Sequence, residues 1–77
     1  MENTQLNPGD KVIFLDYEVF KDSDGRRCVS SRRKRFLGEV VKFAPRGGVV
    51  VKFVDPRPGD RRKTVTVWPK RDRLRIV

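Results

Sequence analysis

The sequence predicts a small all-β domain whose strands curl into a barrel. Short runs of β-branched and aromatic residues alternate with turns rich in Gly, Pro and Asp, which is typical of closely spaced strands. No segment carries an apolar stripe at helical spacing. The chain has 77 residues, enough for one domain with a thin core. We therefore expect one five-stranded barrel over residues 8–77, preceded by a flexible lead-in over residues 1–7.

The first strand is predicted at residues 11–15, directly after a turn at 7–10 (Asn-Pro-Gly-Asp). Proline presets φ and glycine supplies positive φ, so this tetrapeptide suits a tight turn. The run Lys-Val-Ile-Phe-Leu that follows is apolar on both parities. We expect Val12 and Phe14 to face the core.

A long polar first loop is predicted at residues 16–35. Its middle, Asp-Ser-Asp-Gly at 22–25, is a strong turn signal. The flanking segments 17–20 and 27–30 are expected to pair as a protruding two-stranded hairpin.

Two further strands are predicted at residues 36–43 and 49–54, joined by a tight turn at 45–48. Gly38 indicates a bend, because small barrels use glycines or bulges where the sheet curls. Alternation in the later run places three apolar residues on one face: Val49, Val51 and Phe53. The phenylalanines expected in the core are Phe14, Phe36, Phe43 and Phe53.

The last two strands are predicted at residues 63–68 and 74–77, after a proline-stiffened loop at 55–60. A short 3₁₀ turn is expected between them, at 69–73. The earlier strand alternates, with Val65 and Val67 on one side and Thr64, Thr66 and Trp68 on the other. In the closing strand we expect Leu74 and Ile76 to point inward and Arg75 outward.

Four segments together resemble SH3-like barrels: Pro-Gly-Asp-Lys-Val at 8–12, Gly-Glu-Val-Val at 38–41, Val-Val-Val-Lys-Phe at 49–53, and Trp-Pro followed by Leu-Arg-Ile-Val within 68–77. That superfamily includes KOW and Tudor-like modules of ribosome and transcription proteins, small subunits of photosynthetic complexes, and the plasmid-borne, tetrameric type of dihydrofolate reductase. The resemblance implies the fold, and a fold of this kind hosts many unrelated functions.

The strand Thr-Val-Thr-Val-Trp-Pro at 64–69 is also similar to the active-site strand of that reductase, which reads Val-Gln-Ile-Tyr-Pro. In this alignment Thr66 takes the place of the ligand-contacting glutamine, and Trp68 that of the tyrosine. The missing glutamine makes a reductase the remote alternative, and it requires a symmetric tetramer with a central pore.

The distribution of charge points to a polyanionic partner. The net charge is +9, and residues 25–77 hold 17 basic and 4 acidic residues, whereas residues 1–24 hold 2 basic and 6 acidic ones. Arginine outnumbers lysine by 12 to 7, and its planar fork pairs with phosphate and stacks on bases. We expect a nucleic-acid-binding domain, for DNA or RNA, with mainly phosphate contacts and weak sequence specificity.

Nine basic residues are the predicted phosphate contacts: Arg32, Arg33, Lys34, Arg35, Arg61, Arg62, Lys63, Lys70 and Arg71. Trp68 is the predicted base-stacking residue, since an exposed aromatic beside arginines can stack on unpaired bases. The alternative for Trp68 is a structural role, closing the open end of the barrel as part of the core.

The residue inventory argues against catalysis. The chain has no histidine, a single cysteine (Cys28) and no nucleotide or nucleophile motif. We therefore expect no enzymatic activity, no cofactor and no metal site. No apolar run is long enough for a membrane span, and the polar start differs from a signal peptide, so we expect a soluble, cytoplasmic protein without a membrane partner.

A second class of function stays open at this point. The barrel could instead be a protein-interaction module or small accessory subunit that docks on an acidic protein partner. Apolar residues expected at exposed positions, such as Ile13, Leu15 and Val50, could also be buried in a homo-oligomer. We expect a monomer, and light scattering distinguishes these states.

Overall fold

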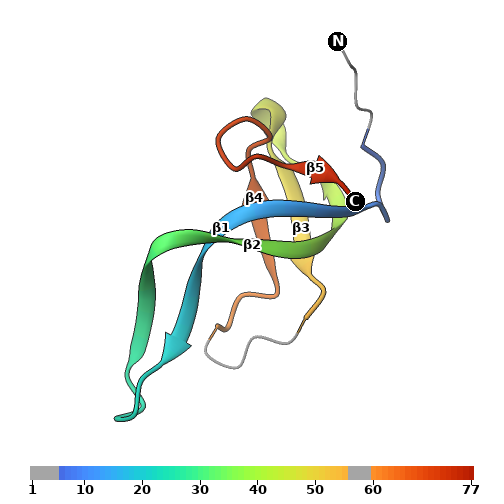
Figure 1. The fold of residues 1–77 in the computed structure, drawn as a ribbon. Helices are drawn as coiled ribbons and strands as arrows, with labels where there is room; N and C mark the ends of the chain where they lie inside the picture. Colours follow the sequence, from blue (N-terminus) through green and yellow to red (C-terminus); the bar gives the residue numbers. More distant parts are fainter. Residues whose placement is uncertain (1–5, 56–59) are drawn as a thin grey trace.

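The computed structural model describes residues 6–55 and 60–77, and it contains five antiparallel strands in one sheet. The strands are β1 (Lys11–Lys21), β2 (Arg27–Phe43), β3 (Val49–Phe53), β4 (Thr64–Val67) and β5 (Arg75–Ile76), in the spatial order β4-β3-β2-β1-β5. The sheet bends so that β1 and β2 cross in front of β3 and β4 (Figure 1). The prediction of a small, five-stranded all-β domain is confirmed.

The first two strands are longer than the apolar pattern indicated. Residues 16–35, expected as a loop with a short hairpin, belong mostly to β1 and β2, which pair continuously except for one irregularity between Tyr17 and Val19. Opposite charges support this polar part of the ladder: Asp16 lies opposite Lys34, and Lys34 Nζ lies 2.7 Å from Glu18 Oε1. Cross-strand charge pairs stabilise a ladder without any apolar period, which explains the difference.

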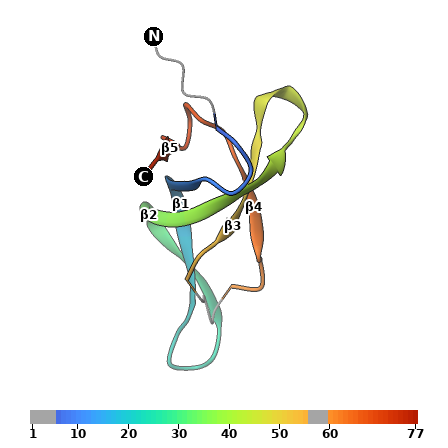
Figure 2. The same cartoon turned by 90° about the vertical axis from the view of Figure 1, so that its right-hand side faces the viewer.

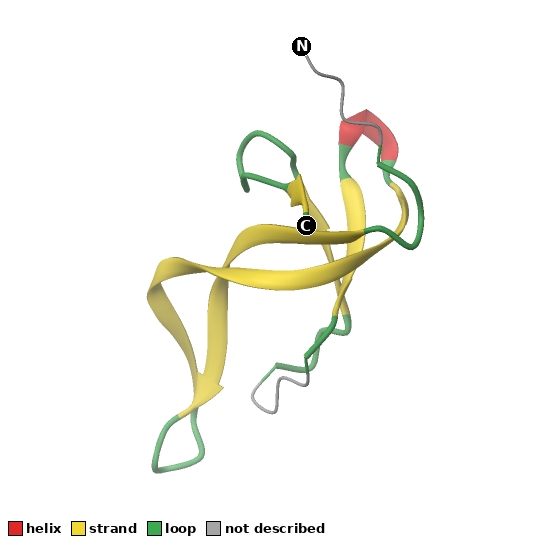
Figure 3. Ribbon diagram, turned by 45° about the vertical axis from the view of Figure 1, so that its right-hand side comes forward, coloured by secondary structure: helices red, strands yellow, loops and turns green. Residues whose placement is uncertain are grey.

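The far ends of β1 and β2 form a two-stranded hairpin that projects away from the other strands (Figures 1 and 3). It contributes to the elongated shape of the molecule, which measures 47 × 23 × 21 Å along its principal axes. The predicted protruding hairpin is therefore present. Its turn is closed by Asp22, whose carboxylate accepts hydrogen bonds from the backbone N–H groups of Asp24 and Arg26.

The core lies inside the bend of the sheet. Its buried residues are Val12, Phe14, Val40, Val49, Val51 and Val67. Phe14, Phe36 and Phe53 pack as a group of three rings with centroids 5.7–6.3 Å apart. The inward placement predicted for Val12 and Phe14 is thus confirmed. Val65 and Val67, which were predicted to share one side of their strand, both lie against the core: Val67 is buried and Val65 is partly buried.

Two residues expected in the core are exposed instead. The side chain of Phe43, at the end of β2, is 52% exposed because it lies beyond the buried valines and after a bulge between Val40 and Lys42. Ile76 is 42% exposed because β5 is only two residues long and ends at the edge of the sheet.

The short 3₁₀ element lies in a different connection from the one predicted. It is η1 (Pro45–Gly47), between β2 and β3, where Pro45 starts the turn and Gly47 takes a positive φ of 88°. Residues 69–73, where it was expected, form a hydrogen-bonded turn in which Asp72 N–H donates to the Trp68 carbonyl at 2.8 Å.

The N-terminal lead-in and the proline-stiffened loop fall largely outside the described residues, which omit 1–5 and 56–59. Leu6, the last apolar residue of the lead-in, is partly buried against the core. Glycine 9 donates its N–H to the Val40 carbonyl at 2.8 Å, which ties the first turn to β2. Figure 2 shows this turn beside the sheet, seen a quarter turn from Figure 1.

Gly38 is the glycine on which the bend depends. A Cβ at this buried position would lie 2.3 Å from a methyl carbon of Val51 and 2.9 Å from both the Lys52 carbonyl oxygen and the Phe14 ring. Backbone and core atoms cannot give way by that much, so only glycine lets β2 approach β3 this closely.

We expect Gly38→Ala to lower the free energy of unfolding by about 1–3 kcal/mol, because the added methyl group overpacks the core. Urea unfolding monitored by circular dichroism measures the change. Ser31→Ala, at an exposed position of the same strand, is the control and should change stability by less than about 0.5 kcal/mol. A Gly38→Ala protein as stable as the wild type would show that the close approach is not required.

Candidate functional site

The four consecutive basic residues at 32–35 are divided by the strand that carries them. They lie in β2, where successive side chains point to opposite faces. Arg33 and Arg35 lie opposite Tyr17 and Leu15 on the outer face of the sheet. Lys34 points the other way and forms the ion pair with Glu18 described above. The run therefore does not form one continuous phosphate-binding surface.

A buried carboxylate, Asp72, binds two of the predicted phosphate contacts. Its Oδ1 lies 2.8 Å from Arg33 Nη1 and 3.1 Å from Arg71 Nε, and its Oδ2 lies 3.0 Å from Arg71 Nη2. The Trp68 backbone N–H donates to the same Oδ2 at 2.9 Å. Arg33 and Arg71 thus donate some of their hydrogen bonds to Asp72, and its carboxylate neutralises part of their charge.

The surroundings of Asp72 favour its ionised form. Burial by itself raises the pKa of this carboxyl, but hydrogen bonds from Arg71 and from the Trp68 N–H, together with the charge of Arg33, outweigh burial and hold the pKa below its ordinary value. The charged form is therefore part of the folded structure at neutral pH.

A second buried carboxylate, Asp60, holds Arg62 in a two-pronged arrangement. Arg62 Nε and Nη2 lie 3.1 and 2.7 Å from Asp60 Oδ2, and Nη2 is also 3.3 Å from Asp16 Oδ2. The hydrogen bonds with Asp60 raise the pKa of Arg62 further. The guanidinium also lies over the Phe53 ring, 5.7 Å from its centroid. Arg62 therefore connects the segment before β4 to β1 and to the core.

Three other predicted phosphate contacts, Arg61, Lys63 and Lys70, are exposed. Arg61 and Lys63 border an open hollow of about 640 Å³ whose lining also includes Asp55 and Asp60. Arg32 is exposed at a separate, shallow hollow on the hairpin, together with Phe20, Val29 and Glu18. The predicted cations are therefore distributed over several surfaces.

Trp68 is half-buried on the outer side of the sheet. Its ring passes close to Gly48, where a Cβ would lie 3.2 Å from the ring edge, and the Arg71 guanidinium lies 6.0 Å from the ring centroid. The ring that was predicted to stack on a base therefore has an arginine near it. Thr66, which takes the place of the reductase glutamine, is exposed on the same parity.

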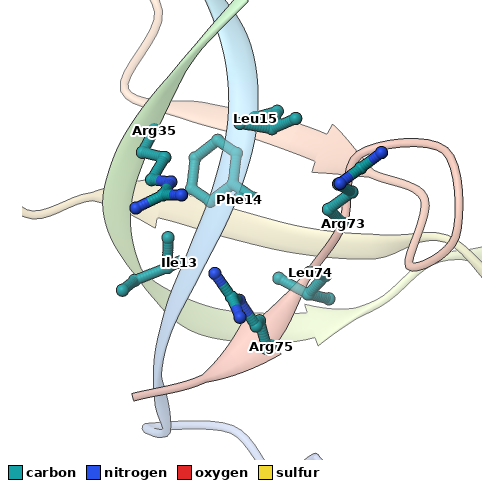
Figure 4. A pocket seen from close by; sticks show the side chains of 7 residues that line it. All are labelled: Ile13, Phe14, Leu15, Arg35, Arg73, Leu74 and Arg75. Atoms are coloured by element: carbon teal, nitrogen blue, oxygen red, sulfur yellow. The ribbon is translucent and has the colours of Figure 1, made fainter.

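The outer face of β1 brings together arginines that lie far apart in the sequence. Ile13 lies between Leu37 on β2 and Arg75 on β5, and Leu15 lies opposite Arg35 on β2. Strand pairing thus places arginines on both sides of an apolar stripe along β1. Together with Arg73, these residues surround a hollow of about 280 Å³ (Figure 4). Its complete lining is Ile13, Phe14, Leu15, Arg35, Arg73, Leu74 and Arg75. We call this feature the β1 hollow.

The arginines of the β1 hollow differ from those at Asp72 and Asp60. Within residues 6–55 and 60–77, no carboxylate forms an ion pair with Arg35, Arg73 or Arg75, and all three are exposed. Of this group the prediction named Arg35 alone. Arg75 was expected to point outward. Its position beside Ile13 follows from the β1–β5 register, which the sequence does not show. Arg73 takes a left-handed conformation with φ of 51°.

Residues 6–55 and 60–77 contain neither a metal-binding cluster nor a membrane-spanning helix. No group of three or more His, Cys, Asp or Glu side chains gathers there in a way that could hold a metal ion. None of the helices described is long and apolar enough to cross a membrane. Cys28 is partly buried in the hairpin, with its Sγ 3.8 Å from Asp22 Oδ2.

Comparison with protein-family models, with curated proteins and with solved structures gives no match for this chain. The resemblance to SH3-like barrels therefore stays a prediction, and the candidate site depends on its own geometry.

We expect Asp72→Asn to lower the free energy of unfolding at pH 7 by about 1–3 kcal/mol, because two arginines lose a charged acceptor. The folded-state pKa of Asp72 lies below its ordinary value of 3.8, so the wild type holds this stabilisation above about pH 4 and loses it as the pH falls further. The difference in the free energy of unfolding between variant and wild type should therefore narrow as the pH falls below about 4, which urea unfolding at several pH values measures.

Glu39→Gln is the matched control for that experiment. Glu39 pairs with Lys11 at 3.0 Å, but both side chains are accessible to solvent, which screens the pair. Loss of the Lys11–Glu39 ion pair should therefore change the free energy of unfolding little. A difference between Asp72→Asn and the wild type that stays constant with pH would contradict the role given to the charge of Asp72.

Proposed function

We propose that the protein binds nucleic acid, DNA or RNA, chiefly through phosphate contacts at the outer face of β1, β2 and β5. The observation that carries this proposal is the β1 hollow, which Arg35, Arg73 and Arg75 border and whose lining includes no carboxylate. Unneutralised arginines at one place produce a positive local field that attracts a polyanion. Their forked guanidinium groups match phosphate oxygens.

The division of the basic residues supports the same proposal. Arg33, Arg62 and Arg71 pair with buried carboxylates, so they contribute to folding and to the shape of the surface. The arginines of the β1 hollow have no such role in the described structure, yet they add charge to a chain that already carries +9. Clustered charge with no structural partner is expected of a surface that binds an anion.

The proposed mode of binding is weakly sequence-specific. Phosphate contacts position a protein on nucleic acid without reading its sequence. Arg61, Lys63 and Lys70, exposed elsewhere on the surface, would extend the contact to neighbouring phosphates. We propose a binding role without catalysis, in an SH3-like barrel located in the cytoplasm.

A second candidate function is docking on an acidic protein through the projecting hairpin. Phe20 and Val29 are 41% and 60% exposed there, beside the basic residues Arg32 and Lys34. Exposed apolar side chains rimmed by charge are typical of protein-interaction surfaces.

If the hairpin serves protein docking, Phe20→Ser should abolish binding of an acidic partner protein and leave nucleic-acid affinity unchanged. A loss of nucleic-acid affinity would instead place the hairpin in the nucleic-acid interface.

We expect the double variant Arg35→Gln/Arg75→Gln to bind nucleic acid roughly tenfold more weakly, a loss of about 1.4 kcal/mol. Two lost phosphate contacts should also reduce the slope of log K against log salt by about 1.4–1.8. Fluorescence anisotropy of a labelled oligonucleotide, titrated at several salt concentrations, measures both quantities.

The matched control is Lys21→Gln/Lys42→Gln, which removes the same charge from exposed positions on β1 and β2. It should weaken binding far less, since these lysines lie away from β5. Equal losses in the two double variants would show that only net charge matters and would contradict the assignment of the β1 hollow. An absence of salt-sensitive binding by the wild type would contradict the proposed function itself.

A further inference from the structure

We propose that the β1 hollow holds an unpaired nucleobase, so that the protein prefers single-stranded nucleic acid to duplex. This inference rests on the proposed function and names the class of nucleic acid that the site would take. The inference follows from the difference in polarity between the apolar floor of the hollow and its cationic rim.

The floor of the hollow is apolar, whereas its rim is cationic. Ile13, Leu15 and Leu74 are partly exposed in it. The arginines lie on both sides of this floor: Arg35 is on β2, and Arg75 is on β5, with Arg73 in the turn before it. Because β1 lies between β2 and β5, these two strands are two strand spacings apart, or about 10 Å. A phosphate group alone would use the rim and leave the apolar floor in contact with water. A flat, apolar group attached to a phosphate would use both.

A nucleotide is such a ligand only when its base is unpaired. In a duplex the face of each base is covered by the neighbouring base pairs, and only base edges are open in the grooves, so a shallow apolar floor meets no base face. In a single strand a base can turn toward the protein, lie on apolar side chains and stack on the guanidinium planes of arginines. The phosphates on either side of that base then reach the arginines of the rim.

The apolar stripe continues along β1 to an exposed aromatic residue. Tyr17 follows Ile13 and Leu15 at every second position, and its side chain is 45% exposed. Arg33 lies opposite Tyr17 on β2, and Asp72 fixes its position. A neighbouring base could therefore stack on the Tyr17 ring next to the one in the hollow.

The hollows described above near β4 and on the hairpin suit an anionic ligand less well. The one near β4 includes Asp55 and Asp60 in its lining, and the one on the hairpin includes Glu18. Carboxylates repel phosphate, and the lining of the β1 hollow contains none. This difference in lining is the reason to assign the nucleotide to the β1 hollow.

The test compares single-stranded and duplex oligonucleotides of equal length with the wild type, Ile13→Thr and Tyr17→Ala. Threonine keeps the β-branched shape and replaces apolar surface in the floor by a hydroxyl group. We expect each variant to lose roughly three- to tenfold in single-strand affinity, the scale of a weakened stacking contact. Duplex affinity and the salt slope should stay unchanged, because no cation is removed.

Val50→Thr is the matched control, since Val50 is partly buried on the outer side of β3, opposite Thr66. Cooperative urea unfolding of every variant verifies that it folds, and Tyr17→Ala tests the stripe at an exposed position if Ile13→Thr does not fold. Equal or tighter duplex binding, with neither substitution affecting single-strand affinity, would overturn this inference and leave the proposed function standing. If the wild type binds neither form, both fail.

Discussion

Asp72 joins the connection between β4 and β5 to both long strands, to β2 through its carboxylate and to β1 through its backbone carbonyl. It accepts hydrogen bonds from Arg33 on β2 and from the Trp68 N–H at the start of the connection. The carbonyl of the same residue accepts from the Leu15 N–H on β1 at 2.8 Å. One residue thus fixes the turn, holds it along β1 and brings the two-residue strand β5 into register. The position of Arg73 and Arg75 beside the β1 stripe depends on this arrangement.

Arginines serve two purposes in this structure, and their partners distinguish them. Arg33, Arg62 and Arg71 hold the described segments together around two buried carboxylates. A buried carboxylate needs such partners, because an isolated charge away from water is costly. Among residues 6–55 and 60–77, the arginines of the β1 hollow form no ion pair with a buried carboxylate. The net charge of +9 therefore overstates the charge that is free for binding.

The bend of the sheet positions both groups. Gly38 lets β2 approach β3 closely, and the core valines fill the inside of the bend. The outer face of β1 then becomes a surface bordered by β2 on one side and β5 on the other. Such a surface can be apolar along its middle and charged at its borders, because strand pairing, and not sequence distance, decides which side chains are neighbours.

The sequence by itself determined the fold class, the inward placement of Val12 and Phe14, the shared side of Val65 and Val67, and the turn of the hairpin. These follow from local rules, namely the alternation of a strand and the φ preferences of Gly and Pro. It also indicated the basic character, which composition alone conveys. The tertiary structure decided which of the basic residues pair with carboxylates. Of the nine predicted phosphate contacts, Arg33, Lys34, Arg62 and Arg71 have carboxylate partners, and Arg33 and Asp72 are 39 positions apart. Likewise Arg75 lies beside Ile13 only through the register between the two ends of the domain. Contacts between residues so far apart in the chain follow from packing and strand register, which no local pattern encodes.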